Sequence, residues 1–252
     1  MFRCHSRNRW LFAGQQLTEA RNRVLYLVES LSPGAHIVAV DGSGRSTLLQ
    51  LLQDDLRRLG CSTVALSLLA ADAESLTQQL ASSLSISTDS QSTVAGRLLR
   101  VREELLGRTA CGRHIVLLLD DVHRGQPDAH SAIEFLHSVA ESSNGLLCLV
   151  TAGDFRFNCP HEARSPMRIP LEPLSAKESN AFLEARLVEL GIPAERITSS
   201  AIRTLVEGTQ GLPRRLLHVC SLVHAVCESQ SLSHIDKSDA TAVIASGLRR
   251  AA

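Results

Sequence analysis

The sequence predicts an α/β protein in which a five-stranded parallel sheet is followed by a small, all-helical domain. Three observations predict this fold class. Short apolar segments alternate with longer amphipathic ones up to residue 171, a pattern that is typical of parallel β-α-β units. A glycine-rich turn separates the first apolar segment from the helical pattern that follows it. Beyond residue 174 the hydrophobic spacing is helical throughout.

The apolar segments set the order of the elements in the sheet domain. The expected strands are 36–40, 62–68, 114–120, 146–151 and 167–171. The expected helices are 46–59, 73–85, 92–107 and 128–142. The third strand is apolar at every position from 115 to 119, as a strand in the middle of a parallel sheet should be. The Ser/Thr-rich residues 82–93 are expected to form a surface loop.

The helical domain is delimited by capping and breaking residues. Ser175 and Glu178 form a capping-box pattern at the start of a helix that should end at Gly191. A second helix is expected at 199–207 and a third after Pro213, and Asp236 should cap a fourth. We therefore expect two domains, 1–173 and 174–252.

The turn after the first strand has the pattern of a phosphate-binding P-loop. Residues 39–46 read Ala-Val-Asp-Gly-Ser-Gly-Arg-Ser, to be compared with G-x-x-x-x-G-K-[ST]. Gly42 and Gly44 let backbone N–H groups turn toward phosphate oxygens, and the helix N-terminus adds partial positive charge. Ser46 is placed to reach a Mg²⁺ ion. The residues expected to contact a nucleotide are Asp41, Gly42, Ser43, Gly44, Arg45, Ser46 and Thr47.

Two positions depart from the P-loop pattern. Ala39 stands where the first glycine is usual, and Arg45 stands where the lysine is usual. Arg45 keeps the positive charge, but guanidinium is broader than ammonium and favours bidentate partners. Since a misplacement of about 1 Å can cost about a hundredfold in rate, hydrolysis should suffer more than binding. The alternative interpretation is an ordinary Gly-Ser-Gly turn without a ligand.

Two carboxylates follow the third strand. Asp120 and Asp121 lie at its carboxyl end, where ligands bind in open α/β sheets. Asp120 suits the role of the Mg²⁺ ligand in P-loop ATPases. Asp121 takes the position of the residue that orients the attacking water, with a side chain one methylene shorter than glutamate. Alternatively, the two carboxylates cap the helix that begins near Pro127.

Composition narrows the functional classes. The 252 residues include 26 Lys and Arg and 26 Asp and Glu, which argues against a protein that coats nucleic acid by charge alone. The seven cysteines form no C-x-x-C pair, and Cys159-Pro-His161 has no matching second half of a metal site. Reduced, buried thiols in a cytoplasmic protein are therefore expected. No apolar run approaches the length of a membrane span, and no secretory signal is recognisable.

Four stretches together resemble AAA+ ATPases of the ExeA/GspA (general secretion pathway) type, which are related to TniB-like transposition ATPases. They extend from residue 17 to about residue 228, and the last of them is the most specific. The stretches are the helical pattern at 17–29, the P-loop, residues 118–123, and residues 171–175 with 209–214.

The resemblance implies roles for further residues. Arg214 would be the sensor-2 arginine, which reads the γ-phosphate from the lid, and Thr151 would be the sensor-1 polar group. Arg164 or Arg168 would supply an arginine finger to a neighbouring subunit, so a homo-oligomer is implied. ATP and Mg²⁺ are the implied cofactors.

Three functional hypotheses remain from the sequence. The first is a slow ATPase that uses its nucleotide state to switch an assembly partner. The second is a nucleotide-binding pseudo-ATPase. The third is a DNA-associated helper of transposition or initiation type, with a basic N-terminal region that could equally be a solvated face. The basic residues of that region are Arg3, Arg7, Arg9, Arg21 and Arg23, beside Trp10.

Overall fold

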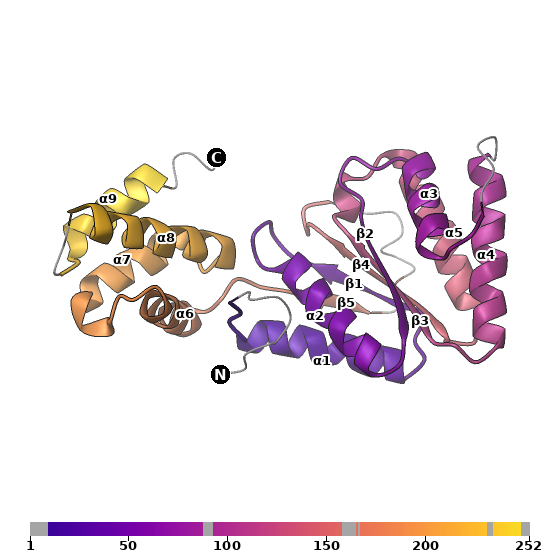
Figure 1. Cartoon of the computed structure of the whole chain (residues 1–252), viewed down its shortest axis with the longest axis horizontal. Helices are drawn as coiled ribbons and strands as arrows, with labels where there is room; N and C mark the ends of the chain where they lie inside the picture. Colours follow the sequence, from indigo (N-terminus) through magenta and orange to yellow (C-terminus); the bar gives the residue numbers. More distant parts are fainter. Residues whose placement is uncertain (1–9, 88–92, 158–164, 166, 231–233, 248–252) are drawn as a thin grey trace. The chain divides into compact units, whose positions relative to one another are not determined.

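The computed structural model describes residues 10–87, 93–157, 165, 167–230 and 234–247 (Figure 1). Arg3, Arg7, Arg9, Cys159, His161 and Arg164, which figure in the sequence analysis, lie outside the described residues. The chain divides into two compact units. The sheet unit comprises Leu17–Asp41 and Arg45–Leu171, and the helical unit comprises the rest.

The sheet unit is built on five strands in the order β2-β3-β4-β1-β5. Each of the four strand pairings is parallel, so the predicted five-stranded parallel sheet is confirmed. The carboxyl ends of all strands therefore lie at one edge of the sheet. The strands are β1 (Gly34–Val38), β2 (Ser62–Ser67), β3 (Ile115–Asp120), β4 (Leu147–Gly153) and β5 (Arg168–Pro170).

Helices cover both faces of this sheet (Figure 1). One face carries α1 (Gln15–Glu29) and α2 (Arg45–Arg58). The other carries α3 (Ala73–Ser83), α4 (Val94–Ala110) and α5 (Pro127–Glu141). A short 3₁₀ turn, η1 (Val122–Arg124), follows β3. Several predicted boundaries were wrong: β1 covers 34–38 rather than 36–40, α3 ends two residues earlier than predicted, α4 covers 94–110 rather than 92–107, and β4 covers 147–153 rather than 146–151.

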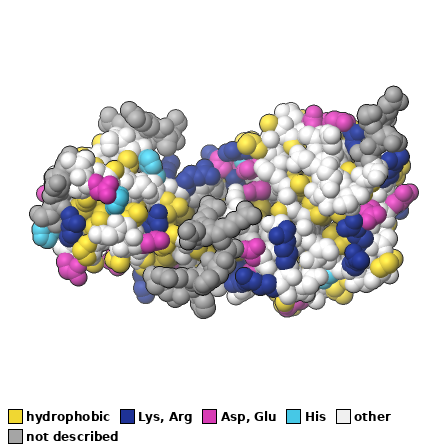
Figure 2. Space-filling model, in the orientation of Figure 1, with side chains coloured by type: hydrophobic (Ala, Val, Ile, Leu, Met, Phe, Trp, Pro, Cys, Tyr) yellow, Lys and Arg dark blue, Asp and Glu magenta, His cyan; other side chains and the backbone are white. Residues whose placement is uncertain are grey.

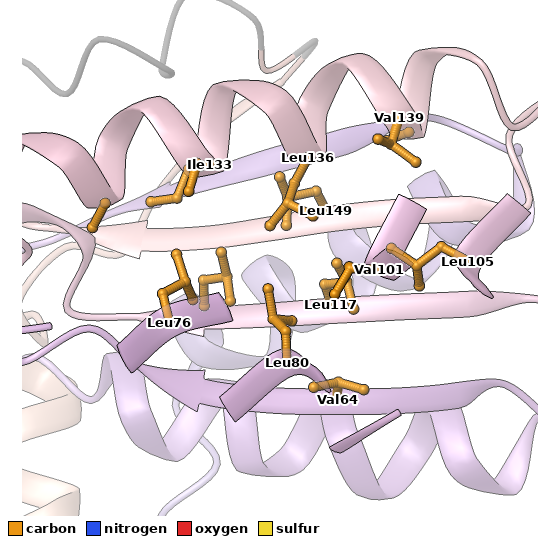
Figure 3. Close-up of a cluster of buried hydrophobic side chains, with 14 of the residues drawn as sticks. Val64, Leu76, Leu80, Val101, Leu105, Leu117, Ile133, Leu136, Val139 and Leu149 are labelled. Carbon is orange, nitrogen blue, oxygen red and sulfur yellow. The ribbon is translucent and has the colours of Figure 1, made fainter. Parts of the chain in front are cut away.

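The two faces of β3 explain why its sequence is apolar at every position. Leu117 and Leu119 pack against α3, α4 and α5, in the cluster drawn in Figure 3. Val116 and Leu118 face the opposite way and pack with α1 and α2. All four side chains are fully buried. Covered on both sides, β3 holds whatever follows Leu119 in a fixed position at the carboxyl edge of the sheet.

The helical unit contains α6 (Ala176–Glu189), η3 (Ala194–Arg196), α7 (Ser199–Thr209), α8 (Pro213–Gln230) and α9 (Lys237–Gly247). The predicted capping box is confirmed, because the Glu178 N–H donates to Ser175 Oγ while Glu178 accepts from the Ser175 N–H. Asp236 accepts from the Ser238 and Asp239 N–H groups, as predicted for the cap of the last helix.

The core of the helical unit is apolar and continuous. Trp10 and Phe12 pack on Phe182 of α6, with ring centroids 4.8 and 5.2 Å away. This anchors the segment before α1 to the helical unit. The fully buried members of this core include Leu183, Leu205, Leu216, Val219 and Cys220.

The surface carries both signs of charge. On the face shown in Figure 2, acidic and basic side chains are interspersed rather than segregated, in keeping with the zero formal net charge. Among the described residues, no helix combines the length and the apolar character needed to cross a membrane. The described cysteines are free thiols, and burial raises the pKa of Cys148 and Cys220 to about 12.

Candidate nucleotide site

The P-loop pattern lies in the structural context that it requires. Residues 39–44 connect the end of β1 to Arg45, the first residue of α2. Gly42 and Gly44 have φ angles of +86° and +105°, in the region that favours glycine because it has no Cβ. The chain therefore makes the strand–turn–helix connection that turns backbone N–H groups into an anion site.

Arg45 is turned back into its own loop. Its side chain is only 6% exposed, and its guanidinium donates to the Ala39 carbonyl at 2.6 Å and to Asp41 at 2.6 Å. A buried guanidinium is stable only when it is paired and hydrogen-bonded, and these two acceptors meet that need. The cation expected to face phosphate is thus satisfied by groups of the protein itself.

Asp41 forms an ion pair with a second arginine. Its Oδ1 accepts from Arg45, and its Oδ2 accepts from Arg124 of η1 at 2.5 Å. Partial burial alone would raise the pKa of Asp41, but the charges and hydrogen bonds of Arg45 and Arg124 together lower it. Sequence reasoning missed Arg124, which is 83 positions from Asp41 and stands in no motif.

The expected Mg²⁺ ligands are in direct contact. Ser46 Oγ donates to Asp120 Oδ2 at 2.5 Å, and the Asp121 N–H donates to Asp120 Oδ1 at 2.8 Å. A hydroxyl and a carboxylate are hard oxygen donors, the ligands that Mg²⁺ prefers beside phosphate oxygens. The donor set at this position therefore fits Mg²⁺.

Asp121 has an unusual backbone conformation. Its φ of 53° and ψ of 33° are left-handed, which aspartate tolerates better than most residues. This turn redirects the chain from β3 into η1 and leaves Asp121 Oδ1 3.5 Å from the Arg45 guanidinium. Asp121 does not cap α5, because the cap position there is Gln126. The capping alternative is therefore wrong for Asp121.

Thr151 lies inside the sheet. Its hydroxyl is fully buried and is 2.7 Å from Nδ1 of His36, its neighbour across β1 and β4. The strand continues for two more residues, so the polar residue at its tip is Asp154. Asp154 is bonded by the side chain of Arg156, which lowers its pKa to about 2. A Gly-Asp pair directly after an apolar run is the signal that could have found it.

A histidine completes this edge of the sheet. His123 has a donor atom within 4.8 Å of carboxylate oxygens of Asp41 and Asp121. Its Nδ1 is buried without a hydrogen-bond partner, and desolvation followed by the charge of Arg45 lowers its pKa. Arg45 and Arg124 already neutralise Asp41. We therefore interpret Asp41, Asp121 and His123 as part of an ion-paired cluster and not as a metal site.

The remaining predicted residues are placed as follows. Arg214 belongs to the first turn of α8 in the helical unit, and its side chain is exposed. Arg168 is the exposed first residue of β5 and pairs in register with His36. Their roles as sensor and arginine finger remain predictions.

No family model and no curated protein matches this chain. Solved structures do match its fold. Cdc6p from Pyrobaculum aerophilum matches with a TM-score of 0.73 and 15% identity over 91% of this chain. Drosophila ORC bound to DNA matches with a TM-score of 0.72 and 13% identity over 97% of the chain.

A third match is the RuvB Holliday junction branch migration motor of Thermotoga maritima, with a TM-score of 0.61 and 14% identity over 92% of this chain. The chain spans 66% of the length of Cdc6p, 70% of the ORC chain and 68% of RuvB. Together with the strand order 2-3-4-1-5 and the helices that follow, these matches give the chain the fold of an AAA+ P-loop ATPase core with a lid.

Proposed function

We propose that this chain is an AAA+ protein that binds Mg-ATP, hydrolyses it slowly and uses its nucleotide state to switch an assembly partner. The observation that carries the proposal is the 2.5 Å contact between Ser46 of the P-loop helix and Asp120 at the tip of β3. A hydroxyl beside the P-loop and a carboxylate on a neighbouring strand tip are the two groups that P-loop ATPases bring together.

Each residue of the site has a distinct part in this proposal. Backbone N–H groups around Gly42 and Gly44 would surround the phosphates, and Ser46 and Asp120 would hold Mg²⁺. When bound, Mg²⁺ would offset negative charge on the phosphate oxygens. Asp121 would orient the attacking water and accept its proton. The reaction cleaves the bond to the γ-phosphate and yields ADP and inorganic phosphate.

The same site favours a second candidate, a nucleotide-binding switch without useful turnover. Arg45 is bonded to Ala39 and Asp41, and Asp121 is short for a water-orienting residue. Binding needs charge and backbone donors, which are present. Turnover needs groups placed to within a fraction of an ångström of the transferring phosphate. The two candidates share the binding step and differ in turnover.

The described part of the basic N-terminal region does not favour the DNA-associated candidate. Arg21 donates to Asp55 at 2.5 Å, and Arg23 is paired with Glu19. Both cations are therefore balanced by carboxylates within the sheet unit. Association with further copies of the chain remains part of the proposal, because AAA+ sites are completed by a neighbouring subunit.

Isothermal titration calorimetry tests the binding step. We expect heat of binding with Mg-ATP, a weaker signal when EDTA removes Mg²⁺, and a loss of the Mg²⁺ effect in Asp120→Ala. Glu103→Ala, which removes an exposed carboxylate from α4, should bind like the parent. Absence of heat and of thermal stabilisation at millimolar Mg-ATP would contradict the proposal.

A further inference from the structure

Two arginines share one carboxylate at the entrance to the P-loop. Arg45 approaches Oδ1 of Asp41 at 2.6 Å, and Arg124 approaches Oδ2 at 2.5 Å. The guanidinium groups come from separate elements, the start of α2 and the end of η1. Each oxygen of Asp41 is thus engaged by its own cation, which is how a phosphate group is held between two arginines.

The position of this bridge is accessible from solvent on one side. Arg45 is 6% exposed, whereas the side chains of Asp41 and Arg124 are 36% and 41% exposed. An anion can therefore approach Asp41 and Arg124 without unfolding the loop. To reach Arg45 it must take the place of the Asp41 carboxylate.

The charges around Asp41 bear on the affinity of this site for anions. Arg45 and Arg124 carry two positive charges, and Asp41 and Asp121 carry two negative charges around them. An incoming phosphate therefore meets two arginines whose charges are already balanced by these two carboxylates. Displacement of Asp41 releases two guanidinium groups at once, and a more highly charged anion gains more from that release.

We propose that Asp41 and a nucleotide phosphate compete for the same two arginines, and that Arg124 becomes a second phosphate-binding arginine once Asp41 is displaced. This inference rests on the proposed function, and it names two residues that set the affinity of that site. Asp41 lowers the affinity for all anions and, by doing so, favours polyphosphates over monophosphates.

Asp41→Asn tests the first half, because asparagine keeps the size of the side chain and removes its charge. We expect affinity for ATP and for inorganic pyrophosphate to rise about tenfold, since two ion pairs no longer compete with the ligand. Affinity for adenosine, which has no charge, should not change. Asp41→Ser provides a second neutral variant if the first is unstable, and thermal denaturation reports on both.

Asp55→Asn is a matched control within the same unit. Asp55 also lies between two arginines, with Arg21 at 2.5 Å from Oδ2 and Arg58 at 3.6 Å from Oδ1. The substitution makes the same change in net charge away from the P-loop. It should leave the affinity for ATP and pyrophosphate unchanged, so a gain in both variants would reduce the effect to non-specific charge and overturn the inference.

Arg124→Gln tests the second half when it is combined with Asp41→Asn. In the native background the substitution removes a phosphate ligand and a partner of Asp41, and the two effects oppose each other. In the Asp41→Asn background only the ligand is lost, so affinity for pyrophosphate should fall about tenfold. An unchanged affinity in that background would leave Arg124 as a structural partner of Asp41.

The two ligands separate this inference from the function on which it rests. Equal affinities of parent and Asp41→Asn for ATP and pyrophosphate would overturn the inference and leave the nucleotide site standing. Tighter pyrophosphate binding by Asp41→Asn without any ATP binding would support the anion site and overturn the nucleotide function. If no variant binds either ligand, both are wrong.

Discussion

Arg45 and Asp121 face each other at 3.5 Å, and they are the two residues that depart most from an efficient P-loop ATPase. We expect the double variant Arg45→Lys with Asp121→Glu to hydrolyse ATP at least about tenfold faster than the parent. The lysine presents a compact charge to the transferring phosphoryl group, and the longer carboxylate reaches further toward the attacking water. Steady-state phosphate release is the measurement.

Two controls frame this experiment. Asp120→Ala should abolish the activity that remains in the parent, because it removes the carboxylate expected to hold Mg²⁺. Asp121 has a left-handed backbone, which glutamate tolerates less well, so thermal denaturation must show that the double variant is folded. A folded double variant that binds ATP and is as inactive as the parent would favour the pseudo-ATPase.

The burial of His36 predicts how the free energy of unfolding depends on pH. Desolvation, together with the charges of Arg168, His137 and Arg45, lowers its pKa from 6.5 to about 4. Between these values the unfolded chain binds a proton that the folded protein excludes, so the free energy of unfolding falls as the pH is lowered. The loss approaches roughly 3 kcal/mol by pH 4.

Urea denaturation at pH 7 and pH 4.5 measures this effect. His36→Gln should lose less stability than the parent between the two values, because glutamine does not titrate. His234→Gln, at an exposed position, should keep the full pH dependence of the parent. A His36→Gln variant with the parent's pH dependence would assign the loss to other groups.

Among the elements, the turn between α5 and β4 is the most sharply constrained. Gly145 has a φ of +79°, and a Cβ there would lie 2.1 Å from the Leu31 carbonyl oxygen. Gly145→Ala should therefore lower the free energy of unfolding by about 1–3 kcal/mol. Gly107→Ala, inside α4 with open space around it, should raise it by about 0.5–1 kcal/mol. Equal effects of the two substitutions in urea denaturation would contradict this account.

The sheet was predictable because its strands are short apolar runs separated by amphipathic helices. The end of β4 was not, because it depends on a neighbouring chain segment. Ala152 and Gly153 extend the strand only by pairing with Ile37 and Val38 of β1. The predicted strand therefore ended at Thr151, which contacts His36 inside the sheet, and not at Gly153; the sensor-1 role of Thr151 stays a prediction.

In the candidate site, too, features set by neighbouring residues in the sequence were predictable, and contacts between distant residues were not. The P-loop pattern and the Asp120-Asp121 pair are local, so the sequence was enough to propose both. Of the two partners of Asp41, Arg45 is four residues away, but Arg124 is set by the fold, since it follows a different strand. Asp41 is predicted to contact nucleotide, and in the structure it binds two arginines. An ion pair between distant residues, such as Asp41 and Arg124, leaves no pattern in a single sequence.

At the scale of the whole molecule, the residues with proposed roles in nucleotide binding belong to both units. The sheet unit holds Arg45, Ser46, Asp120 and Asp121, while Arg214 belongs to the helical unit together with Gly42–Gly44. An arginine in the first turn of a helix is disfavoured by the helix dipole, and α8 has two of them, Arg214 and Arg215, with no acidic residue in that turn. A compensating anion would remove this cost, and a γ-phosphate is such an anion.

We therefore expect Arg214→Ala to weaken ATP about tenfold and ADP by less than about threefold, because only ATP carries the γ-phosphate that the guanidinium would contact. Calorimetric titration of both nucleotides measures the difference. Arg215→Ala is the matched control, since Arg215 occupies the next position of the same turn and bonds Gln210 at 2.8 Å. It should weaken both nucleotides equally or not at all. Equal losses for ATP and ADP in Arg214→Ala would make Arg214 a structural residue of the helical unit, and nucleotide state would then have to reach that unit by another route.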